Sequence, residues 1–450
     1  MKRAIVALTL ALAPALAGCV PKEAGFPDVA RAVAERTGYR ILWNRGGEAD
    51  REVASRVAAL LAKPLGVDEA VQIALLRNRR LQGTYEDLMI AQSDVVQAGL
   101  LHNPVLSGSL RFPLDQRGAP NLELGVEQDF LDVLLIPARK RLASSAFAAA
   151  KLRVGGEVLR LAADVRVAYF TLQGAQQVAA MRRTIAEAGE ASVELAQRQH
   201  DAGNISDLDL AGEQALYEQI RLDLARSEGE ILGARERLIR LLGLFGADIV
   251  FTLPDRLPEL PAADPALDHL EALAISRRLD VAAAREEAQV SAHQLALAGG
   301  SRWLVGGVGL GADFERDVDA RRVVGPTARL ELPIFDQKQA LIARLSAELR
   351  QRQERLAALA VDARSEVREA RGRVLATRGI AAHYRVVVIP LRERIVALSQ
   401  QHYDAMLLGV YQLLMAKQSE VNAYREYIEA VRDYWIARAE LARATGGKVD

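Results

Sequence analysis

The segment Gln199-His200-Asp201-Ala202-Gly203 ends a long helical pattern, and another long helical pattern begins a few residues after it. A related set of residues, Gln401, Tyr403, Asp404 and Ala405, interrupts a second pair of long helical patterns 202 to 203 residues later. Short segments with alternating polar and apolar residues precede each pair. A pattern that recurs at such a spacing predicts a chain built from two similar structural units.

The N-terminus has the features of a secretory signal. Lys2 and Arg3 precede an apolar run over residues 4–17, which is too short to span a bilayer. The run ends in Leu16-Ala17-Gly18-Cys19, which resembles a bacterial lipoprotein signal. That resemblance implies cleavage of residues 1–18 as a signal peptide and attachment of lipid to Cys19. An ordinary secretory signal with an incidental cysteine is the alternative.

The expected lipidated segment covers residues 19–66. In the resembled class of lipoproteins, an aspartate after the cysteine favours retention in the inner membrane, so Val20 indicates the outer membrane. Cys19 is the only cysteine in 450 residues, which excludes a disulfide framework and a thiolate metal cluster. We therefore expect no cofactor apart from the covalent lipid on Cys19, and no metal site.

The composition is typical of long packed helices. Half of the residues are apolar but only 5% are aromatic, and Ala, Leu, Arg, Glu and Gln are abundant. The 58 basic and 58 acidic side chains balance, so nothing favours nucleic-acid binding. No stretch after residue 19 approaches eighteen continuous apolar residues, and we expect no membrane-spanning helix.

Four segments alternate with the period of a β-strand: 104–112, 121–130, 302–315 and 322–335. One face is expected to carry apolar residues: Leu106, Leu110, Phe112, Leu122, Leu124, Val126, Phe130, Leu304, Val308, Leu310, Phe314, Val324, Ala328, Leu330, Leu332 and Ile334. The other face is small, hydroxylated or charged: Ser107, Ser109, Arg111, Glu123, Glu127, Asp129, Asp313, Glu315, Thr327, Arg329 and Glu331. Lipid on the first face and water on the second would suit a transmembrane β-barrel. Two exposed hairpins packed on helices are the alternative.

A transmembrane barrel has to close, because lipid cannot satisfy open sheet edges. Four strands are too few for closure, since the smallest single-chain barrels have about eight. Two copies would give a packed interior, whereas three copies would give twelve strands and a water-filled lumen. A transport function favours a homotrimer.

The remaining elements complete a doubled layout of two helices, two strands and two long helices. The first repeat is predicted at 67–253, with long helices at 139–202 and 207–243. A proline-rich connector follows at 254–265. The second repeat is predicted at 266–450, with long helices at 337–408 and 410–445 and a kink at Pro390.

That order resembles the TolC-type outer-membrane efflux factors. Asn103-Pro104 opens the first strand, Leu332-Pro333-Ile334-Phe335-Asp336 closes the fourth, and Ala202-Gly203 lies at a helix turn. The resemblance covers about residues 67–446. It implies a mainly α chain with a small β part, whose homotrimer forms a twelve-stranded barrel in the outer membrane and a long α-helical barrel in the periplasm.

The resemblance also implies partners and a gate. The helix turns at 199–210 and 402–413 would dock a periplasmic adaptor protein fed by an inner-membrane pump, and would close the periplasmic entrance at rest. The candidate gate residues are Gly203, Asp207, Asp209, Met406, Leu407, Leu408 and Gln412. Capping of the helix after Ser206 is the structural alternative for the two aspartates. At the second turn Leu407 and Leu408 stand where some family members carry an arginine, Met406 replaces a glycine and Gln412 an acidic residue. An apolar constriction therefore competes with a charged lock.

The resulting prediction is a passive outer-membrane conduit for small molecules or metal ions. The stretch 333–337 is similar to outer-membrane components of heavy-metal efflux systems. A channel for type I protein secretion is an alternative, and a structural envelope spacer lipoprotein is an alternative of another class. The six histidines lack metal-ligand spacing and no nucleophile or phosphate-binding motif occurs, so we expect no enzymatic activity.

Overall fold

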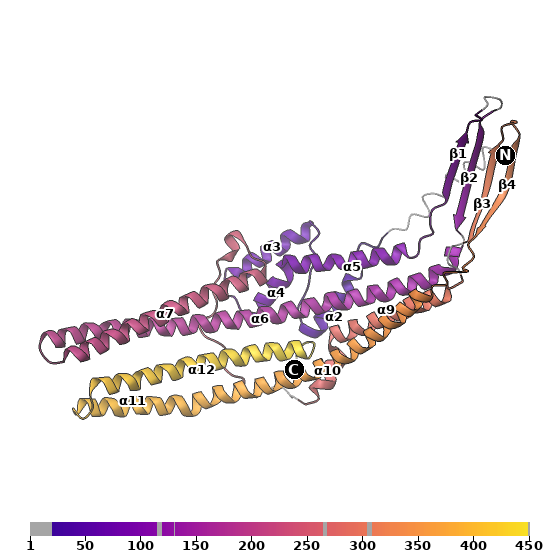
Figure 1. Cartoon of the computed structure of the whole chain (residues 1–450). Coiled ribbons are helices and arrows are strands. Elements are labelled where there is room, and N and C mark those ends of the chain that lie inside the picture. Colours follow the sequence, from indigo (N-terminus) through magenta and orange to yellow (C-terminus); the bar gives the residue numbers. More distant parts are fainter. Residues whose placement is uncertain (1–19, 115–118, 130, 264–267, 304–307, 449–450) are drawn as a thin grey trace. The chain divides into compact units, whose positions relative to one another are not determined.

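The computed structural model describes residues 20–114, 119–129, 131–263, 268–303 and 308–448 (Figure 1). Contacts divide the chain into two compact units. We call Met1–Val29, Tyr85–Val154 and Leu279–Ala360 the sheet unit, and Ala30–Thr84, Gly155–Arg278 and Val361–Asp450 the helical unit. The predicted signal peptide and Cys19 lie outside the described residues, as do Phe130 and Leu304.

The four predicted strands form one antiparallel sheet in the order β1-β2-β3-β4. Their bounds are Val105–Arg111, Asn121–Asp129, Val308–Arg316 and Arg322–Leu330. The fourth strand ends five residues before the predicted limit at 335, because the chain leaves the ladder before Pro333. Within the described part of the chain, β1 and β4 each pair on one side only, so the sheet has two open edges.

The register confirms the predicted faces for the residues that lie within the four strands. Ser109 lies opposite Glu123, which lies opposite Glu315, so polar side chains share one face. Leu110 lies opposite Leu122 on the other face. Ion pairs cross the polar face, with Arg329 2.6 Å from Glu127 and Arg111 3.3 Å from Glu123.

The apolar face is exposed in the single chain. Leu106 is 75% exposed, Leu110 55% and Val324 72%. A contiguous face of this kind is uncommon on a monomeric soluble protein and marks contact with lipid or another protein. The sheet therefore has the surface and the open edges of a fragment of a larger barrel.

The first long helix, α6 (Leu131–Asp201), begins eight residues before the predicted start at 139 and includes Pro137. The proline is near the N-terminal end, where it costs few helical hydrogen bonds. The return helix α7 (Asp207–Leu242) ends at Gly243, whose φ of 70° is the left-handed conformation of a glycine C-cap. It carries no proline along its 36 residues.

The second long helix is interrupted at the predicted place. It consists of α10 (Gln339–His383), a π-helical turn η3 (Tyr384–Val388) and α11 (Ile389–Asp404). Pro390 has no N–H, and the wider π turn immediately before it carries the chain past the missing donor. The return helix α12 covers Val410–Ala444.

One described helical stretch, Gln339–Asp404, contains a window that is long and apolar enough to cross a membrane by length and composition. Only 17% of that window is buried. This finding differs from our expectation of no membrane-spanning helix. The expectation counted unbroken runs of apolar residues, whereas this window is apolar on average and can include charged residues.

Alanines and a few large side chains form a core in the helical unit where α8 (Leu270–Arg277), α10 and α12 meet. The cluster contains Leu270, Ala274, Val367, Ala370, Val374, Tyr434, Ala437, Leu441 and Ala444. Tyr434, Ala437 and Leu441 recur at spacings of three and four along α12, and Ile428 and Val431 of the same helix are also buried. Small residues let the helices approach closely.

The shorter helices complete the layout. They are α2 (Phe26–Thr37), α3 (Glu48–Leu61), α4 (Val67–Arg77), α5 (Arg79–Gln97), the 3-10 turn η2 (Gly246–Ile249) and α9 (Leu279–Gly300). In the helical unit the lead-in before α4 is tied to its surroundings. The Tyr39 hydroxyl donates to Asp68 at 2.6 Å, and Tyr169 donates to the Leu65 carbonyl at 2.8 Å.

Candidate functional site

The first helix turn joins α6 to α7 through a Schellman motif. The Asn204 amide donates to the Gln199 carbonyl and the Gly203 amide to the His200 carbonyl, both at 2.8 Å. Gly203 has a φ of 75°, a left-handed conformation that favours glycine. The glycine is therefore required by the shape of this turn.

The second turn, between α11 and α12, has the same hydrogen bonds. The Leu407 amide donates to the His402 carbonyl at 2.8 Å and the Met406 amide to the Tyr403 carbonyl at 2.9 Å. Met406 has a φ of 59° and so occupies the left-handed conformation that Gly203 occupies in the first turn. The structural repeat is therefore offset by 203 residues here, and His200 corresponds to Tyr403.

The helices that follow the two turns are capped differently. At the start of α7, the Asp209 amide donates to Ser206 Oγ at 3.2 Å, and the Asp209 carboxylate accepts from the Ser206 amide at 3.2 Å. Hydrogen bonds from Ser206 lower the pKa of Asp209 below its ordinary value. At the start of α12 only half of this arrangement remains, because Gly409 has no hydroxyl and its amide donates to Gln412 at 2.9 Å.

A histidine links the two helices of the first turn. His200 Nε2 lies 2.7 Å from an oxygen of Asp207, and its Nδ1 lies 3.7 Å from Asp201. The hydrogen bond to Asp207 raises the pKa of His200 above its ordinary value. At the second turn the corresponding residues are Tyr403 and Val410, so the pair has no equivalent there.

The N-terminal ends of α7 and α12 share a groove of about 620 Å³. It is lined by Leu208, Asp209, Gly212, Glu213, Ala215, Leu216, Val410, Leu414, Met415 and Gln418. Asp209 thus lies beside α12, whereas Asp207 turns to His200. Sequence reasoning missed Leu208, Glu213 and Met415, although all three follow a turn closely enough to have been included.

The predicted gate residues of the second turn are mainly apolar and exposed. Met406 is 94% exposed and Leu407 73%, while Leu408 is half-buried. In the first turn the positions of Leu407 and Leu408 are held by Asn204 and Ile205. The two turns therefore offer different chemistry on one backbone: a capped acidic surface and an apolar one.

The arrangement combines capped helix ends with exposed apolar side chains. Within the described part of the chain, no group of three or more His, Cys, Asp or Glu side chains is placed to hold a metal ion. The charged groups at the first turn are engaged in capping and in the His200–Asp207 pair.

Residues 70–244 match the sequence model of a family described as outer membrane efflux protein. The members of this family are channels rather than enzymes. No curated protein matches the chain.

Several solved structures share the fold. A membrane protein from Pseudomonas aeruginosa is 21% identical with a TM-score of 0.72, over 84% of this chain and 92% of its own. The Campylobacter jejuni CmeC outer membrane channel is 16% identical with a TM-score of 0.73, over 85% of each chain. The open state of the Neisseria gonorrhoeae MtrE outer membrane channel is also 16% identical, with a TM-score of 0.67 over 85% of this chain and 89% of its own.

Proposed function

Because residues 70–244 match the outer membrane efflux protein family, we propose that this chain is the outer-membrane channel of a tripartite efflux system. It acts as a passive conduit from the periplasm to the outside. The observation that carries this proposal is the four-stranded sheet, which has an exposed apolar face, a charged opposite face and two open edges.

The channel is a homotrimer in this proposal. Three copies of β1 to β4 supply twelve strands, enough for a water-filled lumen. The edge strands β1 and β4 run antiparallel in the sheet order, so β4 of one copy can pair with β1 of the next without a change of direction. Closure removes the unpaired backbone groups that lipid cannot satisfy.

The helix turns are the periplasmic end in this proposal, and they meet an adaptor protein that is fed by an inner-membrane pump. The groove between α7 and α12 and the exposed Met406 and Leu407 give this end a surface for partner contact. The pump supplies the energy, and the channel needs no catalytic residue.

We propose that the gate lies at the second turn, because its side chains are apolar where those of the first turn are polar or form a cap. At the second turn, Leu407 and Met406 from three copies would form an apolar constriction that excludes water and ions. At the first turn, the Ser206–Asp209 box keeps the start of α7 rigid. Opening would then move α11 and α12, with the π turn η3 before Pro390 as the position of least regular helix.

We further propose that Cys19 carries lipid and anchors the chain in the outer membrane. Replacing Cys19 with serine should abolish incorporation of labelled palmitate. The sheet should still assemble in that variant, since the barrel is an independent membrane attachment.

The decisive experiment combines conductance with crosslinking across the strand edges. The purified chain should conduct ions in planar bilayers. A cysteine at Ser109 on β1, paired in turn with cysteines at Val323, Gly325 and Thr327 on β4, should yield covalent trimers for at least one pair. All four positions lie on the charged face.

The matched control pairs Ser109→Cys with Glu123→Cys. These residues face each other within one chain, so their crosslink should give no oligomer. A monomeric protein without conductance, with no trimer from any edge pair, would overturn the proposal and favour an envelope spacer.

A further inference from the structure

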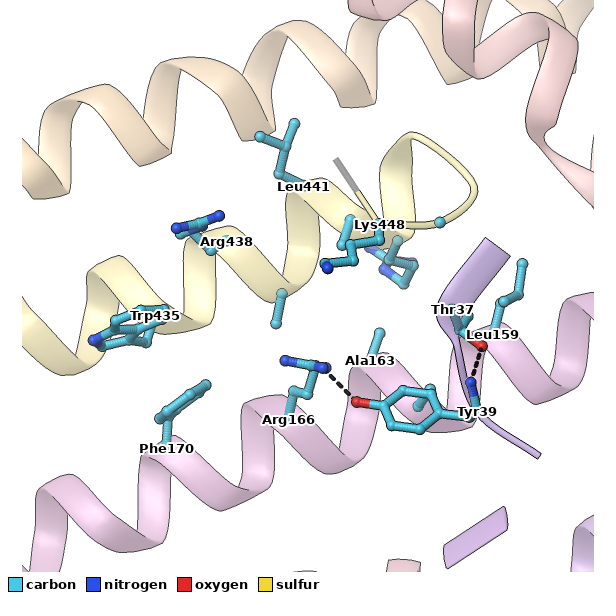
Figure 2. Close-up of a pocket in the computed structure, with 15 residues that line it drawn as sticks. Thr37, Tyr39, Leu159, Ala163, Arg166, Phe170, Trp435, Arg438, Leu441 and Lys448 are labelled. Atoms are coloured by element: carbon cyan, nitrogen blue, oxygen red, sulfur yellow. Dashed lines mark hydrogen bonds between the residues drawn. The ribbon is translucent and has the colours of Figure 1, made fainter. Parts of the chain in front are cut away.

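A cavity of about 200 Å³ lies in the helical unit between α6, α12 and the segment after α2 (Figure 2). Its apolar wall includes Leu159, Ala162, Ala163 and Leu441. The stacked rings of Phe170 and Trp435 border it, with centroids 5.5 Å apart. The cavity is remote in sequence from both helix turns and from the strands, so the proposed channel function does not account for it.

The size of the cavity limits its occupant. A cavity of about 150 Å³ lined by aliphatic and aromatic side chains accommodates benzene. The present cavity is somewhat larger, so one ring with a small substituent fits. The alanines on both facing helices make the space, because a larger residue at any of these positions would fill it.

The polar part of the lining has one sign of charge. Among the fifteen described residues that line the cavity, four are basic and none is acidic: Arg166, Arg438, Arg443 and Lys448. Figure 2 shows Arg166 and Arg438 on opposite sides of the cavity. Asp68, which lies outside the lining, pairs with Arg166 at 2.6 Å.

Arg166 is held in position by neighbours. It donates through Nη2 to both Asp68 and the Tyr39 hydroxyl. Burial and the hydrogen bond to Asp68 raise the pKa of Tyr39, so the phenol stays neutral and adds no negative charge. A guanidinium carries five N–H donors, so donors remain for a ligand.

Arg438 is half-buried, and within the described part of the chain it forms no ion pair. Among the described residues, its guanidinium donates to the Tyr434 hydroxyl at 3.5 Å and lies 5.7 Å from the centroid of Trp435. The last carbonyls of α12 do not compete for it, because those of residues 441–443 accept from the amides of residues 445–447. A half-buried guanidinium without a carboxylate is stabilised by a bound anion.

We propose that this cavity binds a small carboxylate whose apolar body is about the size of one aromatic ring. The ring lies against Ala163 and Leu441, and the carboxylate accepts hydrogen bonds from Arg438 and Arg166. Arg443 and Lys448 lie exposed at the margin and attract the anion. The apolar wall alone would favour a neutral ring, and the basic lining alone would favour an inorganic anion, so the two together select this class.

The test measures binding of 4-fluorobenzoate to the full chain in a neutral detergent, by fluorine NMR. Saturable binding with a Kd of about 0.1 to 1 mM is expected for a ligand of this size. Neutral 4-fluorotoluene and inorganic phosphate should each bind at least about tenfold more weakly, because each lacks one half of the recognition.

Two variants locate the site. Arg438→Gln should weaken 4-fluorobenzoate binding about tenfold through the lost charged hydrogen bond, and Ala163→Leu should abolish binding by filling the cavity. The matched control is Arg425→Gln, on the same helix but outside the lining, which should bind as the parent protein does.

Three results would overturn the proposal. They are absence of saturable binding up to about 10 mM ligand, equal affinity for 4-fluorotoluene, or equal affinity of the Arg438→Gln and Arg425→Gln proteins. The first two need only the parent protein, so the test stands even if a variant fails to fold. None of these results bears on the channel, whose conductance is measured separately.

Discussion

The two helix turns of the helical unit have one backbone and two sets of side chains. Each turn closes with the same pair of hydrogen bonds and one left-handed residue, which is Gly203 in the first turn and Met406 in the second. The first turn then adds a serine cap and a histidine–aspartate pair, and the second adds exposed apolar residues. The shape of such a turn is thus set by its backbone, while its side chains decide what it contacts.

Because equivalent positions differ by 203 residues, each turn supplies a control for the other. Gly203 corresponds to Met406, Asn204 to Leu407 and Ser206 to Gly409. Exchanging residues at these positions tests which differences matter while leaving the backbone pattern in place.

The largest effect is expected from Leu407→Asn, which gives the second turn the residue of the first. If Leu407 contributes to an apolar constriction, a polar side chain should admit water and raise the resting conductance on the order of tenfold. Single-channel recording in planar bilayers measures this change. The reciprocal variant Asn204→Leu should leave the resting conductance within about twofold of the parent. Equal effects of the two exchanges would argue against a gate at the second turn.

The next effect concerns backbone strain at the left-handed position. A non-glycine residue there costs about 1 to 2 kcal/mol, offset in part by the greater freedom of glycine in the unfolded chain. Met406→Gly should therefore stabilise the second turn against local opening by about 1 kcal/mol, and Gly203→Met should destabilise the first by a similar amount.

Hydrogen exchange of the Asn204 and Leu407 amides reports these openings, since each amide closes its turn. Beyond the neighbouring backbone, no atom lies within 4 Å of a Cβ added at Gly203, so the cost in the single chain would come from the backbone alone. We expect Met406→Gly to raise the free energy of local opening and Gly203→Met to lower it. A change of the same sign in both variants would contradict the equivalence of the two positions.

Much of the fold was open to prediction because the responsible patterns are local. The period of two assigned the faces of all four strands, and proline-free stretches indicated the long helices. Pro390 predicted the interruption of the second long helix, because a proline in a helix interior removes a backbone hydrogen bond. The family resemblance was needed for the expected partners, which no local pattern encodes.

Other features depend on the closed structure. The left-handed Met406 follows from the hydrogen bonds of the turn, and methionine itself gives no indication of it. The His200–Asp207 pair joins residues seven apart, which face each other only after the turn has formed. The groove between α7 and α12 and the cavity beside Arg438 join residues more than 190 apart, so their existence required the fold.

A smaller effect is expected from the helix caps. Ser206→Ala removes the acceptor for the Asp209 amide, and should destabilise the start of α7 by about 0.5 kcal/mol, the low end of the range for an exposed cap. Gly409→Ser should change α12 by only a few tenths of a kcal/mol, because glycine is itself a tolerable cap. Hydrogen exchange of the first-turn amides of α7 and α12 compares them. A larger change in stability from Gly409→Ser than from Ser206→Ala would show that the caps do not make the start of α7 more rigid than the start of α12.

The smallest effect is a pH dependence confined to the first turn. The pKa of His200 is raised in the folded chain by its hydrogen bond to Asp207, so the pair adds stability that is fully present below the ordinary pKa of histidine. This stability is lost as the pH rises through the raised value. Exchange protection of the first turn, corrected for the intrinsic effect of pH on exchange, should therefore be greater near pH 5.5 than near pH 8.

The charged groups that face His200 are Asp201 and Asp207. His200→Gln should remove the pH dependence while leaving the Schellman hydrogen bonds intact. The second turn has Tyr403 and Val410 in place of the pair and should change less between the two conditions. A dependence of equal size at both turns would assign it to other groups, and would remove His200 from the differences that set the first turn apart.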